Sequence, residues 1–419
     1  MCIFIGLAVP SLAQSSDQQP HKPIPTKLDK HFLIFPESVV LEEWPHTLEL
    51  VNPPQNLKLL NPGQCIRIGI VAIGDDRDSL LEKTRLSFRV EFAGNSQDHS
   101  LAPLAGAKQI KPEGTDFVNA ALTSAGIQPP DMTMASIGAS SESWCVPANA
   151  QDGTAAFEAE ADTPDGRKKL AGAKIAIESF ETGVKQTFKN AEELEKFTMG
   201  YHYQPNPARI YPALVYFCSE PQFVSGPGAI EINAAFLGAA LKANPAAAKD
   251  FMSRIALRNE CPRDVGALAM LTGGYNIDPI LDTMRNDDRQ RFKQIAKLPD
   301  PYVFGSPAQV PTQFDMLWGI FTATGQIAPM RKIASALTWR PDWEEFDKAR
   351  KSATPIKEWT PSIGRAAAYS AAGWSIGSFQ RTDPLAADYI DSMIASPDTP
   401  DDVKKELKGL LTNPAFKRQ

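Results

Sequence analysis

The chain of 419 residues lacks the sequence features of several common functional classes. It contains no glycine-rich phosphate-binding motif, neither G-x-x-x-x-G-K-(S/T) nor G-x-G-x-x-G after a strand, so a site for ATP, NAD or FAD is not expected. Its 43 basic residues are outnumbered by 49 acidic ones, whereas nucleic-acid-binding domains normally carry a basic face. We therefore expect no cofactor and no nucleic-acid partner.

Histidine and paired cysteines are scarce as well. All five histidines lie in the first half of the chain, the last of them being His202, and none forms an H-x-x-x-H pair. No C-x-x-C pair is present, so we expect no metal site. Histidine is the most common general acid or base at neutral pH, and few positions are left for such chemistry.

Long apolar runs are missing too, so we expect no helix of the ~20 apolar residues that span a membrane. Residues 2–9 are nevertheless apolar, and Ser11-Leu12-Ala13 is a small-x-small triplet followed by polar residues. This pattern is typical of a secretory signal peptide over residues 1–13, although no lysine or arginine precedes it. The alternative is an apolar N-terminus without a targeting role. We expect an exported protein, periplasmic or secreted.

Removal of residues 1–13 would leave four of the five cysteines, Cys65, Cys145, Cys218 and Cys261. An even number of cysteines in an oxidising compartment favours disulfides. The pairing that keeps each bridge within its own half of the chain joins Cys65 to Cys145 and Cys218 to Cys261. Four separate buried thiols are the alternative, since free cysteine is often buried.

Strands are predicted before residue 185 and helices after it. Leu86–Phe92 and Ala155–Ala161 alternate apolar and polar residues, which is typical of half-buried strands, and proline- and glycine-bearing turns separate such stretches. After a proline- and aromatic-rich segment at 201–212, helical patterns continue to residue 411. We predict a multidomain α+β protein: a linker at 14–30, an antiparallel β-sandwich at 31–185, a hinge at 186–212 and an all-α domain at 213–419.

The helical half contains three regions of similar layout, each an apolar helix, a turn with proline and a second amphipathic helix. They are 236–255, 318–337 and 374–394. Stacked helical hairpins of this kind build repeat-like scaffolds with extended surfaces. Unrelated hairpins in an ordinary helical domain are the alternative, because the spacing of the three regions is irregular.

Three stretches carry a resemblance to a known family. Ala234–Pro245 reads as a helix with an aromatic residue that ends in Asn-Pro. Phe314–Leu337 contains the pattern Trp-Gly-x-Phe-x-x-Thr-Gly, and Arg365–Phe379 reads as a helix of small residues that contains Trp-Ser. In these motifs, over roughly 230–395, the chain resembles a bacterial family of exported proteins with a helical C-terminal half and no known activity. The resemblance implies no catalytic residues. The N-terminal half resembles secreted Ig-like sandwiches only in general pattern, because Trp144 adjoins Cys145.

Two clusters are candidate binding sites. Tyr201, His202 and Tyr203 lie in the predicted hinge, where they either bind a ligand or pack between domains in extended conformation, with Pro205 and Pro207 preventing a helix. The second cluster consists of Trp339, Arg340 and Trp343, which lie between predicted helices. Tryptophan and arginine are favoured at binding hot spots, and the alternative is an irregular linker packed on the helices.

Three further patterns suggest chemistry less strongly. Gly373-Trp374-Ser375-Ile376-Gly377 matches the G-x-S-x-G nucleophile elbow, but its flanks are helical and no histidine follows it, which favours small residues between close helices. The acidic loop 74–78 has oxygen ligands for calcium but not the spacing of an EF-hand. Glu158, Glu160 and Asp162 share one face of a predicted strand, where a solvated surface is the simpler interpretation.

The leading hypothesis is therefore an exported, non-enzymatic binding or scaffold protein whose helical domain contacts a protein or cell-envelope partner. One alternative is a periplasmic hydrolase with carboxylates at the domain boundary. A second alternative is a carbohydrate-binding or adhesion module in the sandwich. The catalytic residues that a hydrolase would use are not identified by the sequence.

Overall fold

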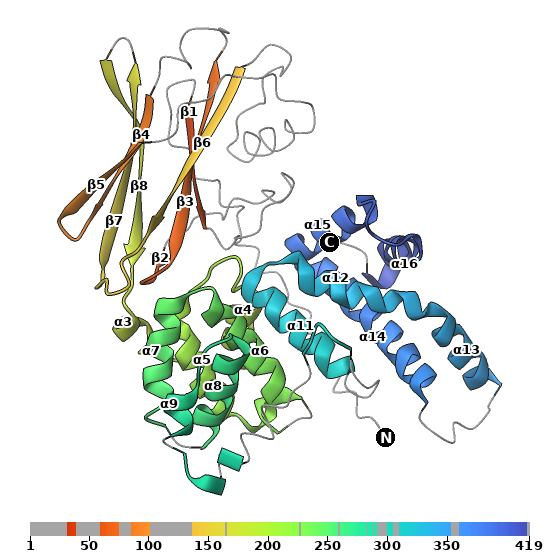
Figure 1. Cartoon of the computed structure of the whole chain (residues 1–419). Coiled ribbons are helices and arrows are strands. Elements are labelled where there is room, and N and C mark those ends of the chain that lie inside the picture. Colours follow the sequence, from red (N-terminus) through yellow and green to blue (C-terminus); the bar gives the residue numbers. More distant parts are fainter. Residues whose placement is uncertain are drawn as a thin grey trace.

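The computed structural model places strands in the first part of the chain and helices in the rest, as the sequence predicts (Figure 1). It describes residues 32–38, 59–74, 85–100, 136–163, 166–225, 228–258, 260–282, 284–287, 289–290, 300–304, 310–352 and 360–416. The acidic loop at 75–78 and the linker at 14–30 lie outside these ranges. Within them, no helix is both long and apolar enough to cross a membrane.

The described strands form two sheets. A three-stranded antiparallel sheet has the order β1-β3-β6. A five-stranded sheet has the order β2-β8-β7-β4-β5, in which the short β2 runs parallel to β8 and the other pairs are antiparallel. The strands are β1 (Phe32–Ser38), β2 (Leu59–Leu60), β3 (Cys65–Gly74), β4 (Arg85–Phe92), β5 (Asn95–Ser100), β6 (Ser136–Cys145), β7 (Gly153–Thr163) and β8 (Gly166–Ile177).

The two sheets meet at Trp144. This buried side chain of β6 packs edge-on against Phe157 of β7, with ring centroids 5.2 Å apart. Next to it, Cys65 and Cys145 lie opposite each other on β3 and β6 and form a disulfide, which confirms the first predicted pair. A β-sandwich over 31–185 stays a prediction, because the side chains of β1 and of most of β3 and β6 are not among those described.

The turn at Asn61-Pro62-Gly63 links the strand region to the helices. Asn61 is fully buried, and its Nδ2 donates to the carbonyl oxygen of Glu178 at 2.8 Å. The Nδ2 of Asn244 donates to the carbonyl oxygen of Pro62 at 3.1 Å. Gly63 has a φ of +78°, and a Cβ there would lie 2.7 Å from a neighbouring alanine side chain, so the position requires glycine. Buried hydrogen bonds therefore fix this end of the strand region against the helices.

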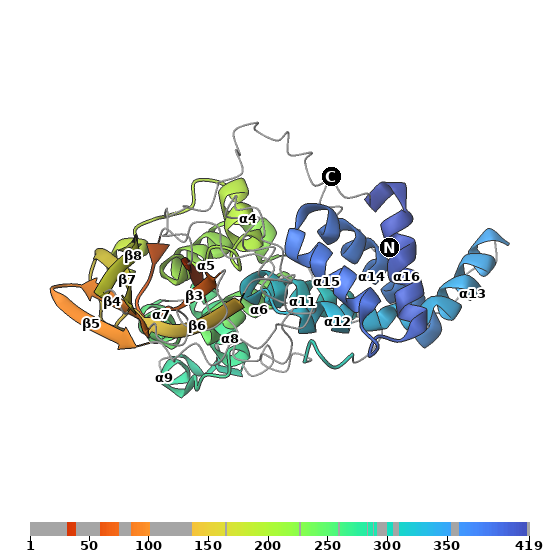
Figure 2. The same ribbon diagram turned by 90° about the horizontal axis from the view of Figure 1, so that it is seen from above.

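The helices form two layers, which we call the first and the second helical layer; Figure 2 shows the strand region and the two layers in succession. The first layer packs large apolar side chains of α4 to α9 into one core. It contains the second predicted disulfide, Cys218–Cys261, which links α5 to α8. Its elements are α3 (Phe180–Gly183), α4 (Ala191–Met199), α5 (Ile210–Ser219), α6 (Ala229–Lys242), α7 (Pro245–Ile255), α8 (Glu260–Thr272) and α9 (Asp278–Leu281), with short 3-10 helices at Pro207–Arg209 and Pro221–Phe223.

The second layer has its own core, in which Phe321 and Leu337 are almost fully buried. Each of the three predicted helical hairpins is a pair of consecutive helices, α6–α7, α11–α12 and α14–α15. The elements of the second layer are α11 (Val310–Thr324), α12 (Ile327–Ser335), α13 (Arg340–Lys351), α14 (Pro361–Thr382), α15 (Pro384–Ala395) and α16 (Asp401–Thr412), with 3-10 helices at Ala336–Trp339 and Pro414–Phe416.

Two local predictions need correction. The segment around Trp339 and Trp343 is helical rather than an irregular linker: it is a 3-10 turn that runs directly into α13. Pro341, which reads as a helix breaker, occupies the first turn of α13, where its missing N–H has no intrahelical partner to lose. The segment 201–212 is likewise not extended throughout, because a 3-10 turn begins at Pro207 and α5 begins at Ile210.

Candidate functional site

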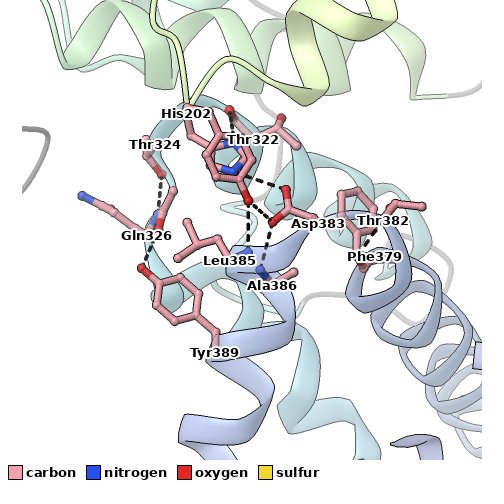
Figure 3. Close-up of polar contacts among 12 residues, drawn as sticks. His202, Thr322, Thr324, Gln326, Phe379, Thr382, Asp383, Leu385, Ala386 and Tyr389 are labelled. Carbon is pink, nitrogen blue, oxygen red and sulfur yellow. Dashed lines mark hydrogen bonds and ion pairs between the residues drawn. The ribbon is translucent and has the colours of Figure 1, made fainter. Parts of the chain in front are cut away.

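The predicted hinge residues lie where the two helical layers meet. Helix α4 ends at Met199, and in the turn after it His202 and Tyr203 reach the end of α11 and the start of α15. Figure 3 shows His202 beside Thr322 and Asp383. Because α4 belongs to the first layer and α11 and α15 to the second, these side chains join the layers. We call this contact the layer junction.

Asp383 is the central acceptor of the layer junction, and it caps α15. Its Oδ1 accepts a hydrogen bond from the backbone N–H of Ala386 at 3.0 Å, and Pro384 occupies the first helical position. An aspartate followed by proline is a favoured helix start, because the carboxylate satisfies a free N–H and proline has none to satisfy. The same Oδ1 accepts a hydrogen bond from the Tyr203 hydroxyl at 2.8 Å. That hydroxyl in turn accepts a hydrogen bond from the backbone N–H of Leu385 at 3.0 Å.

His202 is enclosed between Asp383 and α11. Its Nδ1 lies 3.2 Å from the carbonyl oxygen of Thr322, which also accepts the His202 backbone N–H at 3.0 Å. Its Nε2 lies 3.3 Å from Oδ2 of Asp383, an ion-pair distance without good hydrogen-bond alignment. The ring also packs 5.3 Å from the ring of Phe321, centroid to centroid. Both ring nitrogens therefore face oxygen atoms of the second layer.

Burial sets the electrostatics of the junction. The side chains of His202 and Asp383 are only 1% and 5% exposed. Burial acts to raise the pKa of Asp383, but the nearby His202 ring, the Ala386 N–H and the Tyr203 hydroxyl outweigh it and hold that pKa below its ordinary value. Burial, together with the Asp383 charge, raises the pKa of Tyr203. The junction is thus a charged carboxylate surrounded by donors inside the protein.

Tyr201 differs from its two neighbours because it points into the first layer. It is 2% exposed and packs edge-on against Phe236, with ring centroids 5.5 Å apart. Burial raises the pKa of its hydroxyl. The three consecutive residues thus anchor the turn on both sides, with Tyr201 in one core and the other two against the other layer.

Close backbone packing completes the layer junction. Gly325, which follows α11, has a φ of +67°, and a Cβ there would lie 3.3 Å from Leu385 and 3.4 Å from His202. Its carbonyl oxygen accepts the hydroxyl of Tyr389 at 2.8 Å. The position therefore combines a backbone conformation that favours glycine with little room for a side chain.

The second candidate cluster lies on the side of the second layer away from the layer junction. Trp343 packs against Tyr369 of α14 with ring centroids 6.2 Å apart, and Arg340 pairs with Glu344 at 2.6 Å and with Glu406 of α16. Trp339 packs against Phe304, with centroids 5.5 Å apart. These residues fix the base of α13, which projects beyond the rest of the layer in both views (Figures 1 and 2).

The weaker sequence patterns have structural explanations. Ser375 lies in the middle of α14 and donates its hydroxyl to the carbonyl oxygen of Ala372, so it is not on a strand-to-helix turn. Gly377 packs against Phe416, as expected for small residues at a close approach. Glu158 lies opposite Arg89 in the register of β7 and β4, a favourable pairing on a sheet.

Sequence reasoning identified His202 and Tyr203 but not their acidic partner. The available signal was Asp383-Pro384 at the start of a predicted helix, which identifies a cap but not its tertiary contact. Searches with the sequence and with the structure found no matching family model, no similar curated protein and no similar solved structure. The function is therefore argued from the residues alone.

Proposed function

We propose that the chain is an exported, non-enzymatic binding protein in which an N-terminal β-sandwich and a helical scaffold act together. The scaffold contacts a protein or cell-envelope partner. The two disulfides are compatible with an oxidising compartment. The hinge residues Tyr201, His202 and Tyr203, which were candidates for ligand binding, serve instead to hold the two helical layers together.

The observation that carries this proposal is an exposed tryptophan. Trp374 lies in the 22-residue helix α14 and is 58% exposed, whereas its neighbours Ala372 and Ile376 are buried. Tryptophan is among the residues that contribute most to binding when a partner covers them. A large aromatic side chain at the surface of a fixed helix suits a partner that buries it at little entropic cost.

The burial of the histidine–carboxylate pair at the layer junction argues against the hydrolase alternative. His202 and Asp383 do form a histidine–carboxylate pair, which such an enzyme would use. A general base must, however, come within hydrogen-bond reach of the substrate or of one bridging water. Here the ring is 1% exposed and both its nitrogens face protein oxygens, so the pair supports the fold in this conformation.

The test is capture from a cell-envelope extract with the full chain as bait, followed by binding measurements with the purified captured protein. Trp374→Ala is compared with Leu257→Ala, a matched control that removes an exposed apolar side chain, 87% exposed, from the first layer. Loss of a hot-spot residue costs about 2 kcal/mol or more, so we expect binding about 30-fold weaker for Trp374→Ala only. Equal binding by both variants would contradict the proposal, as would hydrolase turnover that His202→Asn abolishes.

A further inference from the structure

The two disulfides of the chain lie in different surroundings. Cys218–Cys261 links two helices, and both of its residues are half-buried and pack against the core of the first layer. Cys65–Cys145 instead joins β3 to β6, where Cys145 is exposed and Cys65 is half-buried. Among the four bridged cysteines, Cys145 is thus the exposed one, and the two bridges should differ in how easily a reagent from solution reaches them.

The alternation of side chains at the end of β6 explains why Cys145 is exposed. Successive side chains of a strand point to opposite faces of the sheet. The residues on either side of Cys145, namely Trp144 and Val146, are only 5% and 1% exposed. Trp144 packs against Phe157 of the other sheet. The side chain of Cys145 therefore points away from that sheet, and the disulfide lies on the outer face of the β3–β6 pair.

Backbone hydrogen bonds hold the two strands together beside the disulfide. The N–H of Val146 donates to the carbonyl oxygen of Gln64 at 2.9 Å, and the N–H of Gly63 donates to the carbonyl oxygen of Val146 at 3.0 Å. Cys65 and Cys145 are opposite each other in the register of the same two strands. Because this pairing does not need the disulfide bond, the two sulfur atoms should stay close to each other after the bond has opened.

We propose that Cys65–Cys145 is a reversible thiol-exchange site, which a small external thiol attacks at Cys145, and that Cys218–Cys261 is a structural bridge. A thiolate must reach the sulfur that it attacks, and exposed disulfides are generally the labile ones. In the first step, the thiolate of the small molecule forms a bond with Sγ of Cys145. The bond between Cys65 and Cys145 breaks, and its electron pair leaves on Sγ of Cys65, which takes up a proton.

The mixed disulfide on Cys145 then reacts in one of two ways. Cys65, as a thiolate, attacks Sγ of Cys145 and expels the small thiol, which restores the bridge. Alternatively, a second small thiol attacks the sulfur of the first, which releases the disulfide of the small molecule and leaves both cysteines as thiols. The two thiols supply the two electrons of this reduction. The exchange does not depend on what the helical scaffold binds, so it stands or fails separately from the proposed function.

The first test treats the full chain with reduced glutathione and follows both bridges by alkylation of free thiols and non-reducing peptide mapping. Cys65–Cys145 should open at least about tenfold faster than Cys218–Cys261, and a transient glutathione adduct should form on Cys145. Equal or reversed rates, no opening of either bridge, or an adduct on Cys65 alone would overturn the inference. The peptide that contains Cys2 is read separately, so this fifth cysteine does not interfere.

Two matched variants test access to each sulfur separately. Cys65→Ser leaves Cys145 as a free thiol, and Cys145→Ser leaves Cys65 as a free thiol. With oxidised glutathione, Cys65→Ser should form its mixed disulfide at least about tenfold faster than Cys145→Ser, because its remaining thiol is the exposed one. Circular dichroism checks that both variants are folded, and the first test needs neither of them. The same rate for two folded variants would also overturn the inference.

Discussion

The two helical layers meet at the layer junction and along helices α6 and α11, and they differ in their crosslinks and polar contacts. Both layers bury large apolar side chains almost completely: Leu214, Leu237 and Phe251 lie in the first layer, and Leu317, Phe321 and Ile333 lie in the second. The first layer also has the Cys218–Cys261 disulfide. The first layer therefore has a covalent link between α5 and α8, and the described part of the second layer contains no disulfide.

In the second layer, small buried residues along α14 and polar contacts between helices add to the apolar core. Along α14 the buried positions include Ala366, Ala368 and Ala372, which allow neighbouring helices to approach closely. Asp342 accepts two hydrogen bonds from Arg365, at 2.8 and 2.9 Å, and links α13 to α14. Alanine buries little apolar area, so each such position contributes less to stability than a buried phenylalanine. Asp383 caps α15 of the second layer, so we expect the layer junction to matter more to that layer than to the first.

The largest expected effect is the loss of the junction carboxylate. Asp383→Ala leaves His202 and Tyr203 buried without their acceptor, and breaking a buried charged contact typically costs about 3–5 kcal/mol. Asp383→Asn should cost less, because asparagine also caps helices and still accepts from Tyr203. Urea unfolding measures the loss, and peptide-resolved hydrogen exchange should show faster exchange mainly in α12, α15 and α16.

The matched control for this prediction is Asp398→Asn, which removes an exposed carboxylate of the second layer and should change stability by less than about 0.5 kcal/mol.

The pH dependence of stability provides an independent check. The pKa of Asp383 is depressed, so its contribution is complete above the unfolded value of about 3.9 and is lost as the pH falls through the lower folded value. The stability difference between the unchanged chain and Asp383→Asn should therefore shrink in acid. A difference that grows would contradict the assigned role.

Removal of the Cys218–Cys261 disulfide should have the next largest effect, and in the other layer. The bridge closes a sequence separation of 43 residues, and such crosslinks typically contribute about 2–4 kcal/mol by restricting the unfolded chain. In the double variant Cys218→Ser and Cys261→Ser, hydrogen exchange should accelerate in α5 and α8 while α12 and α16 keep their protection. Equal acceleration in both layers would show that they unfold as one unit, and the comparison between them would fail.

Local sequence signals predict the helices of both layers well where a cap is present. The predicted hairpins at 236–255 and 374–394 end at, or within one residue of, the ends of α7 (Pro245–Ile255) and α15 (Pro384–Ala395), and both of these helices have a side-chain cap. In α15 the reason is visible, because Asp383-Pro384 starts the helix through a side-chain cap. Such signals depend on neighbours in the sequence, so one sequence is enough to find them.

The tertiary partners could not be predicted in the same way. His202 and Asp383 are far apart in the sequence, and nothing near either residue indicates that they meet. Helix α13 was missed because Pro341 and two tryptophans resemble a linker, although proline is favoured in a first turn. Its position depends on contacts with Tyr369 and Glu406. These are long-range contacts, which periodicity does not specify.

The smallest expected effect compares one helix cap from each layer. Asn244 is 2% exposed; its Oδ1 accepts from the Ala247 N–H at 3.0 Å, and its Nδ2 donates to the carbonyl oxygen of Pro62. Thr360 is exposed and makes only the cap bond, to the Ile363 N–H at 3.3 Å. Loss of a cap costs about 1 kcal/mol, and a further buried hydrogen bond adds about as much. Asn244→Ala should therefore lose about 2 kcal/mol and Thr360→Ala about 0.5–1 kcal/mol, measured as shifts of the urea midpoint at constant slope.

Asn244→Ser separates the two roles of this residue, because serine keeps the cap of α7 but cannot donate to Pro62 over the same distance. If the hydrogen bond to the Pro62 carbonyl holds the strand region against the first layer, Asn244→Ser should lose about half of what Asn244→Ala loses, about 1 kcal/mol. Exchange should then accelerate in the turn at 61–64 while α7 keeps its protection. A serine variant as stable as the unchanged chain would mean that the other contacts of the turn, such as those of Asn61 and Gln64, hold it, and that the first layer needs no contact from Asn244 to the strands.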